Sequence, residues 1–253
     1  FIRYHFSVVH NSGQPVPIDE VLRNLPVLEP PKYAFGNEGN GHFVNMAGRW
    51  GLDQRVIGSG AVYADLDNDG DLDLYCASGS DEFAAYTKIY QDHLFINNGK
   101  GNYSPDSLAL PINYTSKSCA KAVDFDNDGD LDLVVNNLNE ESGIYKNMSR
   151  ENDHTSYLDV KLKYKGANVN AIGSKIYLYA GGKFQYLEVD PNRGFQSCIS
   201  TVAHFGLVQL KTVDSMRISW PDNEIQTLLN IPANQKLLVK YKAESVKRLH
   251  QVL

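Results

Sequence analysis

The amino-acid sequence predicts an all-β protein in which a partial β-propeller is followed by a compact antiparallel β domain. Three observations support this prediction. An acidic segment and a hairpin-like segment each occur twice at nearly the same offset. Units of about 40 to 60 residues with about four strands each are typical of propeller blades. The C-terminal part of the chain instead alternates apolar and polar side chains with the period of half-buried strands.

The acidic segment is the clearest repeat. Residues 64–74 return almost letter for letter at 123–133, 59 residues later. Segments rich in Asn and Gly precede the two copies, at 34–43 and 94–103, and their turn residues between apolar flanks predict β-hairpins. Each sequence unit is thus a hairpin followed by an acidic loop, and a third unit begins at 143–147. So few units cannot close a ring, so either further chain supplies the other blades or the blades form an open stack. Two hairpins in an ordinary β-sandwich are the alternative.

Each acidic loop predicts a calcium site. Five aspartates within nine residues would repel one another strongly without a counter-ion. Hard oxygen donors at alternate positions, with glycine at the sixth, form the pattern of a calcium loop. We assign side-chain ligands to positions 1, 3, 5 and 9 and a backbone carbonyl to position 7. The ligands are Asp65, Asp67, Asp69 and Asp73 with the carbonyl of Asp71 in the first loop, and Asp124, Asp126, Asp128 and Asp132 with the carbonyl of Asp130 in the second.

An EF-hand, a magnesium site and a solvated turn each fit the two loops less well. An EF-hand requires Glu at position 12 and flanking helices, whereas Cys76 and Val135 occupy that position and apolar β-formers flank both loops. Magnesium prefers to keep its waters in a strict octahedron. A solvated turn would need two near-identical copies without a shared constraint. Because the ligands fill the coordination sphere and no partnered base or nucleophile lies nearby, the two ions should stabilise the fold rather than catalyse a reaction.

The chain divides into four segments. Residues 1–32, with prolines around a possible short helix at 18–25, predict a connection from a preceding blade. Residues 33–154 hold the two-plus propeller repeats, residues 155–245 the β domain and residues 246–253 a C-terminal tail. In the β domain Leu158, Val160 and Leu162 alternate with charged residues, and the Gly181-Gly182 turn predicts a hairpin.

Charge also separates the two halves. Residues 1–154 carry 11 Lys and Arg against 23 Asp and Glu, a net charge of −12, and residues 155–253 carry 13 against 7, a net charge of +6. An acidic half argues against nucleic acid as a partner, while the basic half could dock an anionic glycan or the acidic half itself. No apolar run approaches the ~20 residues of a membrane helix. The N-terminal residues include neither an initiator Met nor the pattern of a signal peptide, so we expect this sequence to be a piece of a longer chain.

The three cysteines define no site. Cys76, Cys119 and Cys198 have neither metal-ligand spacing nor an even count. Buried free thiols are the expectation for all three.

Both parts of the chain carry family motifs. The two Asp-x-Asp-x-Asp-Gly-x-x-Asp loops, with Leu-Phe-Ile-Asn-Asn-Gly at 94–99 ahead of the second, resemble FG-GAP/VCBS repeats. Such repeats form blades of calcium-binding propellers like the integrin α head. The C-terminal half resembles the ASPIC/UnbV domain through 170–175, 193–197, 204–207 and 220–223, although Asn223 stands where that domain commonly has Gly. Together they resemble the cartilage acidic protein type of architecture, also found in large surface proteins of Bacteroidetes, which implies a closed propeller, export and a role in adhesion.

We therefore expect a non-enzymatic, calcium-binding, extracellular or cell-surface protein that presents a surface to protein or glycan partners. In a bacterium it would be associated with the outer membrane. One alternative is part of a calcium-dependent, lyase-like propeller enzyme that degrades polysaccharides, and another is a purely structural spacer. The enzyme needs clustered Lys, Arg or His near the funnel of the ring, but the histidines are scattered and neither His-Glu-x-x-His nor Gly-x-Ser-x-Gly occurs.

Two further features allow both a functional and a structural interpretation. His204, followed by Phe205 and Gly206, is expected to be a packed structural histidine rather than a catalytic one. Tyr63, Tyr75 and Tyr103 could form a face on which a glycan stacks, although at alternating strand positions such residues more often pack between blades.

Overall fold

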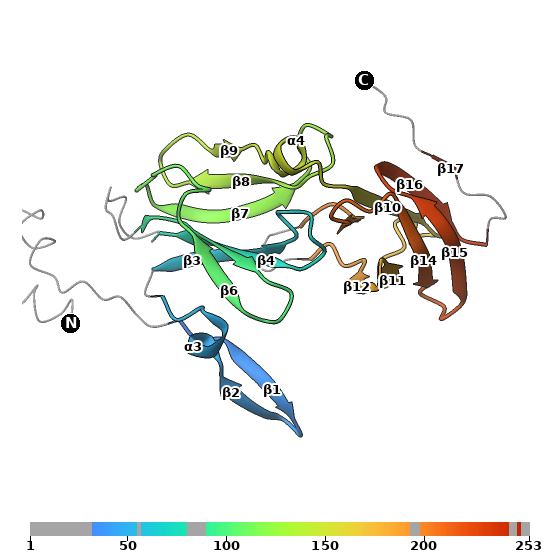
Figure 1. Ribbon diagram of the computed structural model, residues 1–253, viewed down its shortest axis with the longest axis horizontal. Helices are drawn as coiled ribbons and strands as arrows, with labels where there is room; N and C mark the ends of the chain where they lie inside the picture. The colour runs from blue at the N-terminus through green and yellow to red at the C-terminus, as the bar shows by residue number, and fades with distance from the viewer. Residues whose placement is uncertain (1–31, 55–56, 80–89, 193–197, 243–246, 249–253) are drawn as a thin grey trace, which may run out of the picture.

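The computed structural model describes residues 32–54, 57–79, 90–192, 198–242 and 247–248. These residues form five β-sheets and two short helices. The sheets gather in two lobes, with the propeller-like sheets on one side and the C-terminal domain on the other (Figure 1). The predicted all-β architecture is confirmed.

A four-stranded antiparallel sheet, in the order β3-β4-β5-β6, holds the first acidic loop between its first two strands. The strand β4 is buried along its whole length, because its alternate side chains enter two different clusters. Tyr75 and Ala77 pack against the second sheet, whereas Leu74 and Cys76 pack with Phe95 on the other side. Burial of both faces is what stacked propeller blades require. The strands are β3 (Gly58–Ala64), β4 (Asp73–Ser78), β5 (His93–Asn97) and β6 (Tyr103–Asp106).

The second acidic loop joins the first two strands of an antiparallel sheet in the order β7-β8-β9. Its strand β7 lies against β3 of the first sheet. Both strands carry a register irregularity at the equivalent place, between Gly58 and Gly60 and between Lys117 and Cys119. The sequence repeat is therefore also a repeat of backbone structure. The strands are β7 (Lys117–Val123), β8 (Asp132–Asn137) and β9 (Gly143–Tyr145).

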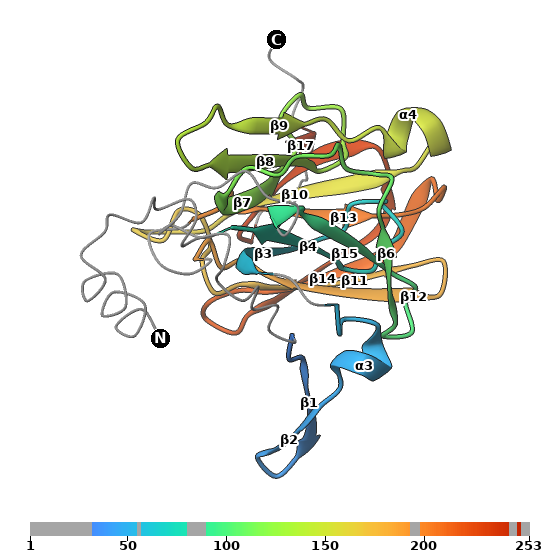
Figure 2. The ribbon, with the colours of Figure 1, turned by 90° about the vertical axis from the view of Figure 1, so that its left-hand side faces the viewer.

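The sheets are offset from the sequence units. Each unit is a hairpin followed by an acidic loop, yet the β5–β6 hairpin pairs with β4, which follows the preceding loop. Residues 143–147, expected to begin a third sequence unit, pair with the preceding sheet in the same way, since residues 143–145 form its strand β9. The hairpin at 34–43 is β1 (Phe35–Gly39) and β2 (His42–Asn45), which projects from the other sheets next to α3 (Ala47–Trp50) (Figure 2). A period in the sequence fixes the length of a repeat but not where each sheet begins.

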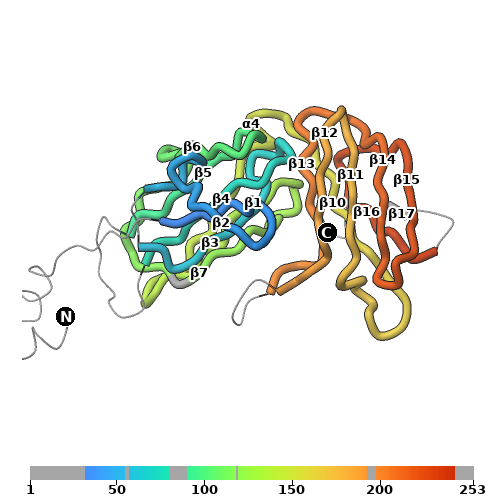
Figure 3. The backbone as a smooth tube through the Cα atoms, turned by 90° about the horizontal axis from the view of Figure 1, so that it is seen from below, coloured from blue at the N-terminus to red at the C-terminus, as the bar shows by residue number. Residues whose placement is uncertain are grey.

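Two four-stranded sheets, β13-β10-β16-β17 and β12-β11-β14-β15, form the C-terminal domain (Figure 3). Their inner faces share one core, which includes Leu158 of β10, Ile176 of β11 and Met216 of β14. The pairing is antiparallel except that β10 and β16 are parallel, a detail that side-chain alternation does not reveal. The strands are β10 (Tyr157–Lys163), β11 (Lys175–Ala180), β12 (Lys183–Glu188), β13 (Val202–Gly206), β14 (Thr212–Ser219), β15 (Ile225–Pro232), β16 (Gln235–Lys240) and β17 (Lys247–Arg248).

Other expectations have mixed outcomes. Asn223 adopts a φ of 64°, the left-handed conformation that glycine favours, so the turn is kept.

The three cysteines are free, but only Cys76 is buried. The prediction of buried thiols is wrong for Cys119 and Cys198, which are exposed; in β7 the neighbour Ala120 points into the core instead. The expected helix at 18–25 and residues 249–253 lie outside the described residues. Within the described ranges, no helix combines the length and apolarity that crossing a membrane requires.

Candidate metal centre

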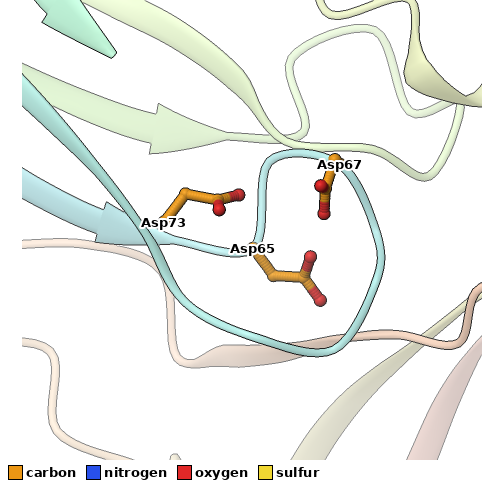
Figure 4. A group of neighbouring side chains, drawn as sticks. All are labelled: Asp65, Asp67 and Asp73. Atoms are coloured by element: carbon orange, nitrogen blue, oxygen red, sulfur yellow. The ribbon is translucent and has the colours of Figure 1, made fainter. Parts of the chain in front are cut away.

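The first acidic loop brings three of its aspartates together. Carboxylate oxygens of Asp65, Asp67 and Asp73 lie within 4.8 Å of one another. Asp65 and Asp67 point into the space that the loop surrounds, and Asp73 points toward them from the strand that leaves the loop (Figure 4). Asp73 is fully buried and accepts hydrogen bonds from the backbone N–H groups of Leu66 and Asn97, each at 2.9 Å. These bonds fix the position 9 carboxylate at the strand end.

The loop folds around its own carboxylates. Asp65 accepts the backbone N–H of Asp69 at 3.0 Å and that of Gly70 at 2.9 Å. Asp67 also accepts the N–H of Asp69, at 3.1 Å. Gly70 has a φ of 92°, which explains why glycine stands at position 6. The acidic residues therefore shape the loop as well as gathering negative charge.

Burial deprives these carboxylates of water. Burial raises the pKa of Asp65 and of Asp73 to about 7, and the neighbouring aspartates add to the rise. Burial likewise raises the pKa of Asp67 and of Asp69. Such shifts mean that hydrogen bonds and nearby positive groups, such as Lys183 beside Asp69, do not fully offset the cost of burying the ionised carboxylates. A cation inside the loop would provide further positive charge, so the donor set fits a metal ion.

The second loop repeats this arrangement. Carboxylate oxygens of Asp124, Asp126 and Asp132 lie within 4.8 Å of one another. Asp132 is buried and accepts the backbone N–H groups of Phe125 and Asn147, each at 2.8 Å. Asp124 Oδ1 is buried without a hydrogen-bond partner. In both loops the same three positions, 1, 3 and 9, form the inward-facing group.

The aspartates at positions 5 and 7 are placed differently. Asp128 and Asp130 group with Glu151 of α4 (Ser149–Asp153), with carboxylate oxygens again within 4.8 Å of one another. Asp130 is fully buried, its Oδ1 has no hydrogen-bond partner, and burial raises its pKa to about 7. In the first loop Asp71 lies 3.3 Å from the Lys183 ammonium. Glu151 has no signal in the sequence, because it lies outside the repeated segment.

The outer side of each loop contacts the C-terminal domain. Asp65, at position 1, accepts the backbone N–H of Gly206 at 3.0 Å. At position 4, Asn68 is fully buried; its Oδ1 lies 2.8 Å from His204 Nε2, and its carbonyl accepts the N–H of Val208 at 2.8 Å.

The second loop uses the same positions. The Lys236 ammonium donates to Asp124 Oδ2 at 2.8 Å and to Asn127 Oδ1 at 2.7 Å. Asn68 and Asn127 have left-handed φ values of 59° and 64°. Positions 1 and 4 of both loops thus contact the C-terminal domain. The opposite charges of the two halves allowed for such docking, but no pattern in the sequence indicated these positions.

The glycine at position 6 lies against the same domain. A Cβ atom on Gly129 would lie 2.0 Å from the ring of Tyr157, and one on Gly70 would lie 2.7 Å from the amide of Gln185. On the opposite side, a Cβ on Gly206 would lie 2.1 Å from Asp65 Oδ2. The two parts of the chain therefore approach each other closely at all three glycines, and most tightly at Gly129 and Gly206.

His204 is part of this interface. Its side chain is 6% exposed and its Nδ1 lies 2.8 Å from Asp159 Oδ1. Because Nε2 faces Asn68 Oδ1, both ring nitrogens are engaged with oxygen atoms. The arrangement agrees with a packed structural histidine.

The three tyrosines considered as a glycan-stacking face do not form one. Tyr75 is fully buried and its hydroxyl donates to Asp92 at 2.6 Å. Tyr103 packs against a different cluster, on the other side of the sheet, whereas Tyr63 is exposed.

Comparisons with known proteins agree with this arrangement. Residues 78–135, which include the second acidic loop, match the family model described as FG-GAP-like repeat. Residues 164–246 match the family model described as ASPIC and UnbV. The two matches thus place a segment similar to an FG-GAP-like repeat ahead of one similar to ASPIC and UnbV. The repeat match runs from a hairpin to an acidic loop and so follows the sequence unit rather than the sheet.

Two curated relatives have this combination. Cartilage acidic protein 1 of Mus musculus and that of Homo sapiens are each 23% identical to the chain over 259 aligned residues. The alignments cover 77% of this chain but 38% of each relative. The chain thus spans well under half the length of these relatives.

Proposed function

We propose that the chain is part of an extracellular or cell-surface interaction scaffold that bound calcium stabilises. One observation carries the proposal. The loops that gather carboxylates at positions 1, 3 and 9 also contact the C-terminal domain through positions 1, 4 and 6. An ion that fixes a loop would therefore also fix the surface on which the C-terminal domain packs. The combination of FG-GAP-like repeat and ASPIC and UnbV domain suggests such a scaffold.

The inward-facing aspartates would hold the ions, one in each loop. Their donors are all hard oxygens, which suit calcium or magnesium rather than zinc. Calcium accepts six to eight oxygen ligands, so it can also use the position 5 carboxylates of Asp69 and Asp128 and the carbonyls of Asp71 and Asp130. Bound calcium supplies the positive charge that the buried carboxylates lack. The protein in turn orders the loops through the backbone N–H groups that bind Asp73 and Asp132.

The proposal assigns a binding role rather than a catalytic one. His204 is the histidine that most invites an enzymatic role, but Asp159 and Asn68 engage both of its ring nitrogens. We infer that the partners are proteins or glycans at the cell surface, and that a bacterial protein of this type lies at the outer membrane. A screen of the chain against glycans and surface proteins should find a ligand, whereas a spacer would bind nothing on either panel.

Thermal unfolding tests the calcium part of the proposal. With a Kd of about 10 μM and 1 mM calcium, each site adds about 2.7 kcal/mol to the free energy of unfolding. Two such sites should raise the melting temperature by roughly 10 to 20 °C over the same protein in excess chelator. Asp67→Asn and Asp126→Asn keep the side-chain shape and each remove one charge from one loop, so each should remove part of the increase. An equal melting temperature with calcium and with chelator would refute the proposal.

A further inference from the structure

The two acidic loops differ at one structurally equivalent position. The backbone N–H of Asn97 binds the position 9 carboxylate of the first loop, and the N–H of Asn147 binds that of the second. Both asparagines also donate their side-chain amide to the carbonyl of the residue at position 8. The preceding residues therefore correspond: Ile96 in the first sheet and Lys146 in the second.

Lys146 places its ammonium among the carboxylates of the second loop. Its Nζ lies 2.5 Å from Asp126 Oδ2, 3.0 Å from Asp128 Oδ2 and 3.0 Å from Glu151 Oε1. A lysine side chain carries a positive charge at neutral pH, so a fixed cation already lies beside these carboxylates. Asp126 belongs to the inward-facing group that we propose for calcium, and Asp128 stands at position 5.

The other lysines near the loops also distinguish the second loop from the first. Lys236 contacts Asp124, so two of the three inward-facing carboxylates of the second loop have a lysine partner. In the first loop Lys183 contacts Asp69 and Asp71. Among the residues that the structure describes, no lysine or arginine forms an ion pair with Asp65, Asp67 or Asp73.

We propose that Lys146 is a tethered competitor for the cation of the second loop, so that the second loop binds calcium more weakly than the first. The inference depends on the proposed calcium sites. A cation that enters the second loop must weaken or displace the contact of the ammonium with Asp126, whereas Ile96 offers no such competition. Because the lysine side chain is 46% exposed, it can move into solvent when the ion binds. Calcium should therefore fill the loops in sequence, the first before the second.

Calcium titration calorimetry of the full chain tests the inference. The wild-type protein should bind two calcium ions in two steps, the second roughly tenfold weaker than the first, about 1.4 kcal/mol. Asp67→Asn should weaken the tighter step and Asp126→Asn the weaker one, which assigns each step to its loop. Lys146→Gln should tighten the weaker step by roughly tenfold. Lys146→Arg is the matched control, because it keeps the charge and should keep the weak step.

The outcomes separate this inference from the proposed function. Two sites of equal affinity, or a Lys146→Gln variant that binds calcium like the wild type, would overturn the role of Lys146 and leave the calcium scaffold standing. A weaker step that tightens equally in Lys146→Gln and Lys146→Arg would overturn competition by charge. If the wild-type chain binds no calcium, both proposals fail.

Discussion

Gly206→Ala should damage the contact between the propeller sheets and the C-terminal domain. The added Cβ would lie 2.1 Å from Asp65 Oδ2 and 2.6 Å from backbone atoms of Asn68. The N–H of Gly206 donates to Asp65 at 3.0 Å, and loss of a buried bond to a charged group costs about 1.5 to 3 kcal/mol. Forcing extra volume into a packed site costs a further 1 to 3 kcal/mol or so. Together these amount to about 2.5 to 6 kcal/mol, which lowers the melting temperature by roughly 5 to 24 °C in a chain of this size.

Differential scanning calorimetry in saturating calcium measures this effect. Gly58→Ala is the matched control, because the nearest atom to its Cβ lies 4.0 Å away and the substitution should leave the melting temperature unchanged. Asp65→Ala removes one of the clashing atoms, so Gly206→Ala should cost less in that background than in the wild type. The proposed contact would be refuted if Gly206→Ala had the melting temperature of the wild type. It would also be refuted if Gly206→Ala lowered the melting temperature equally in the wild-type and Asp65→Ala backgrounds.

Two other substitutions test features outside the interface. The Lys117 side chain is fully buried 3.6 Å from Asp92, so Lys117→Met should lower the free energy of unfolding by about 3 to 5 kcal/mol because it removes the positive charge beside a buried carboxylate. Lys100→Met, at an exposed position, should have no effect in the same urea titration. The Tyr241 hydroxyl donates to Asp222 at 2.6 Å and lowers the pKa of that carboxyl. A lowered pKa stabilises the fold above about pH 4 and this contribution is lost as pH falls further. The stability difference between wild type and Asp222→Asn should therefore be largest near neutral pH and shrink in acid; a constant difference would contradict it.

The sequence contained enough information to find the metal-ligand candidates. Asp65, Asp67 and Asp73 occupy alternating or strand-terminal positions of a loop whose turn is set by Gly70, so local spacing determines that their carboxylates converge. The hairpins at 34–43 and 94–103 were predictable for the same reason, because turn residues and strand alternation act over a few residues. The assignments of all ten aspartates as calcium ligands, including the carbonyls of Asp71 and Asp130, stay predictions.

Features that depend on distant parts of the chain were not predictable. In the sequence Asn68 cannot be told from an ordinary loop residue. Its role depends on Gly129, Thr155 and His204, which contact its side-chain amide and come from distant parts of the chain. Glu151 joins Asp128 through a helix that begins after the repeated segment ends. The first strand of each sheet could not be predicted either. The sequence allows β4 to pair with the hairpin before it or with the one after it, and the structure shows that it pairs with β5 of the later hairpin.

The opposite charges of the two halves meet at the acidic loops, but charge alone does not hold the interface together. Lys183 and Lys236 extend from the basic half to the acidic loops. Lys183 is about half exposed, and an exposed ion pair of this kind contributes only about 0 to 1 kcal/mol. The buried bond of Asp65 to the Gly206 N–H contributes more, since a hydrogen bond to a charged group is worth about 1.5 to 3 kcal/mol, and the buried Asn68 adds a further bond to His204. Lys183 therefore orients the two surfaces, whereas the buried loop positions, with the largely buried pair of Lys236 and Asp124, supply most of the stability of the interface. High salt should accordingly weaken this interface much less than a change at Asp65 or Asn68.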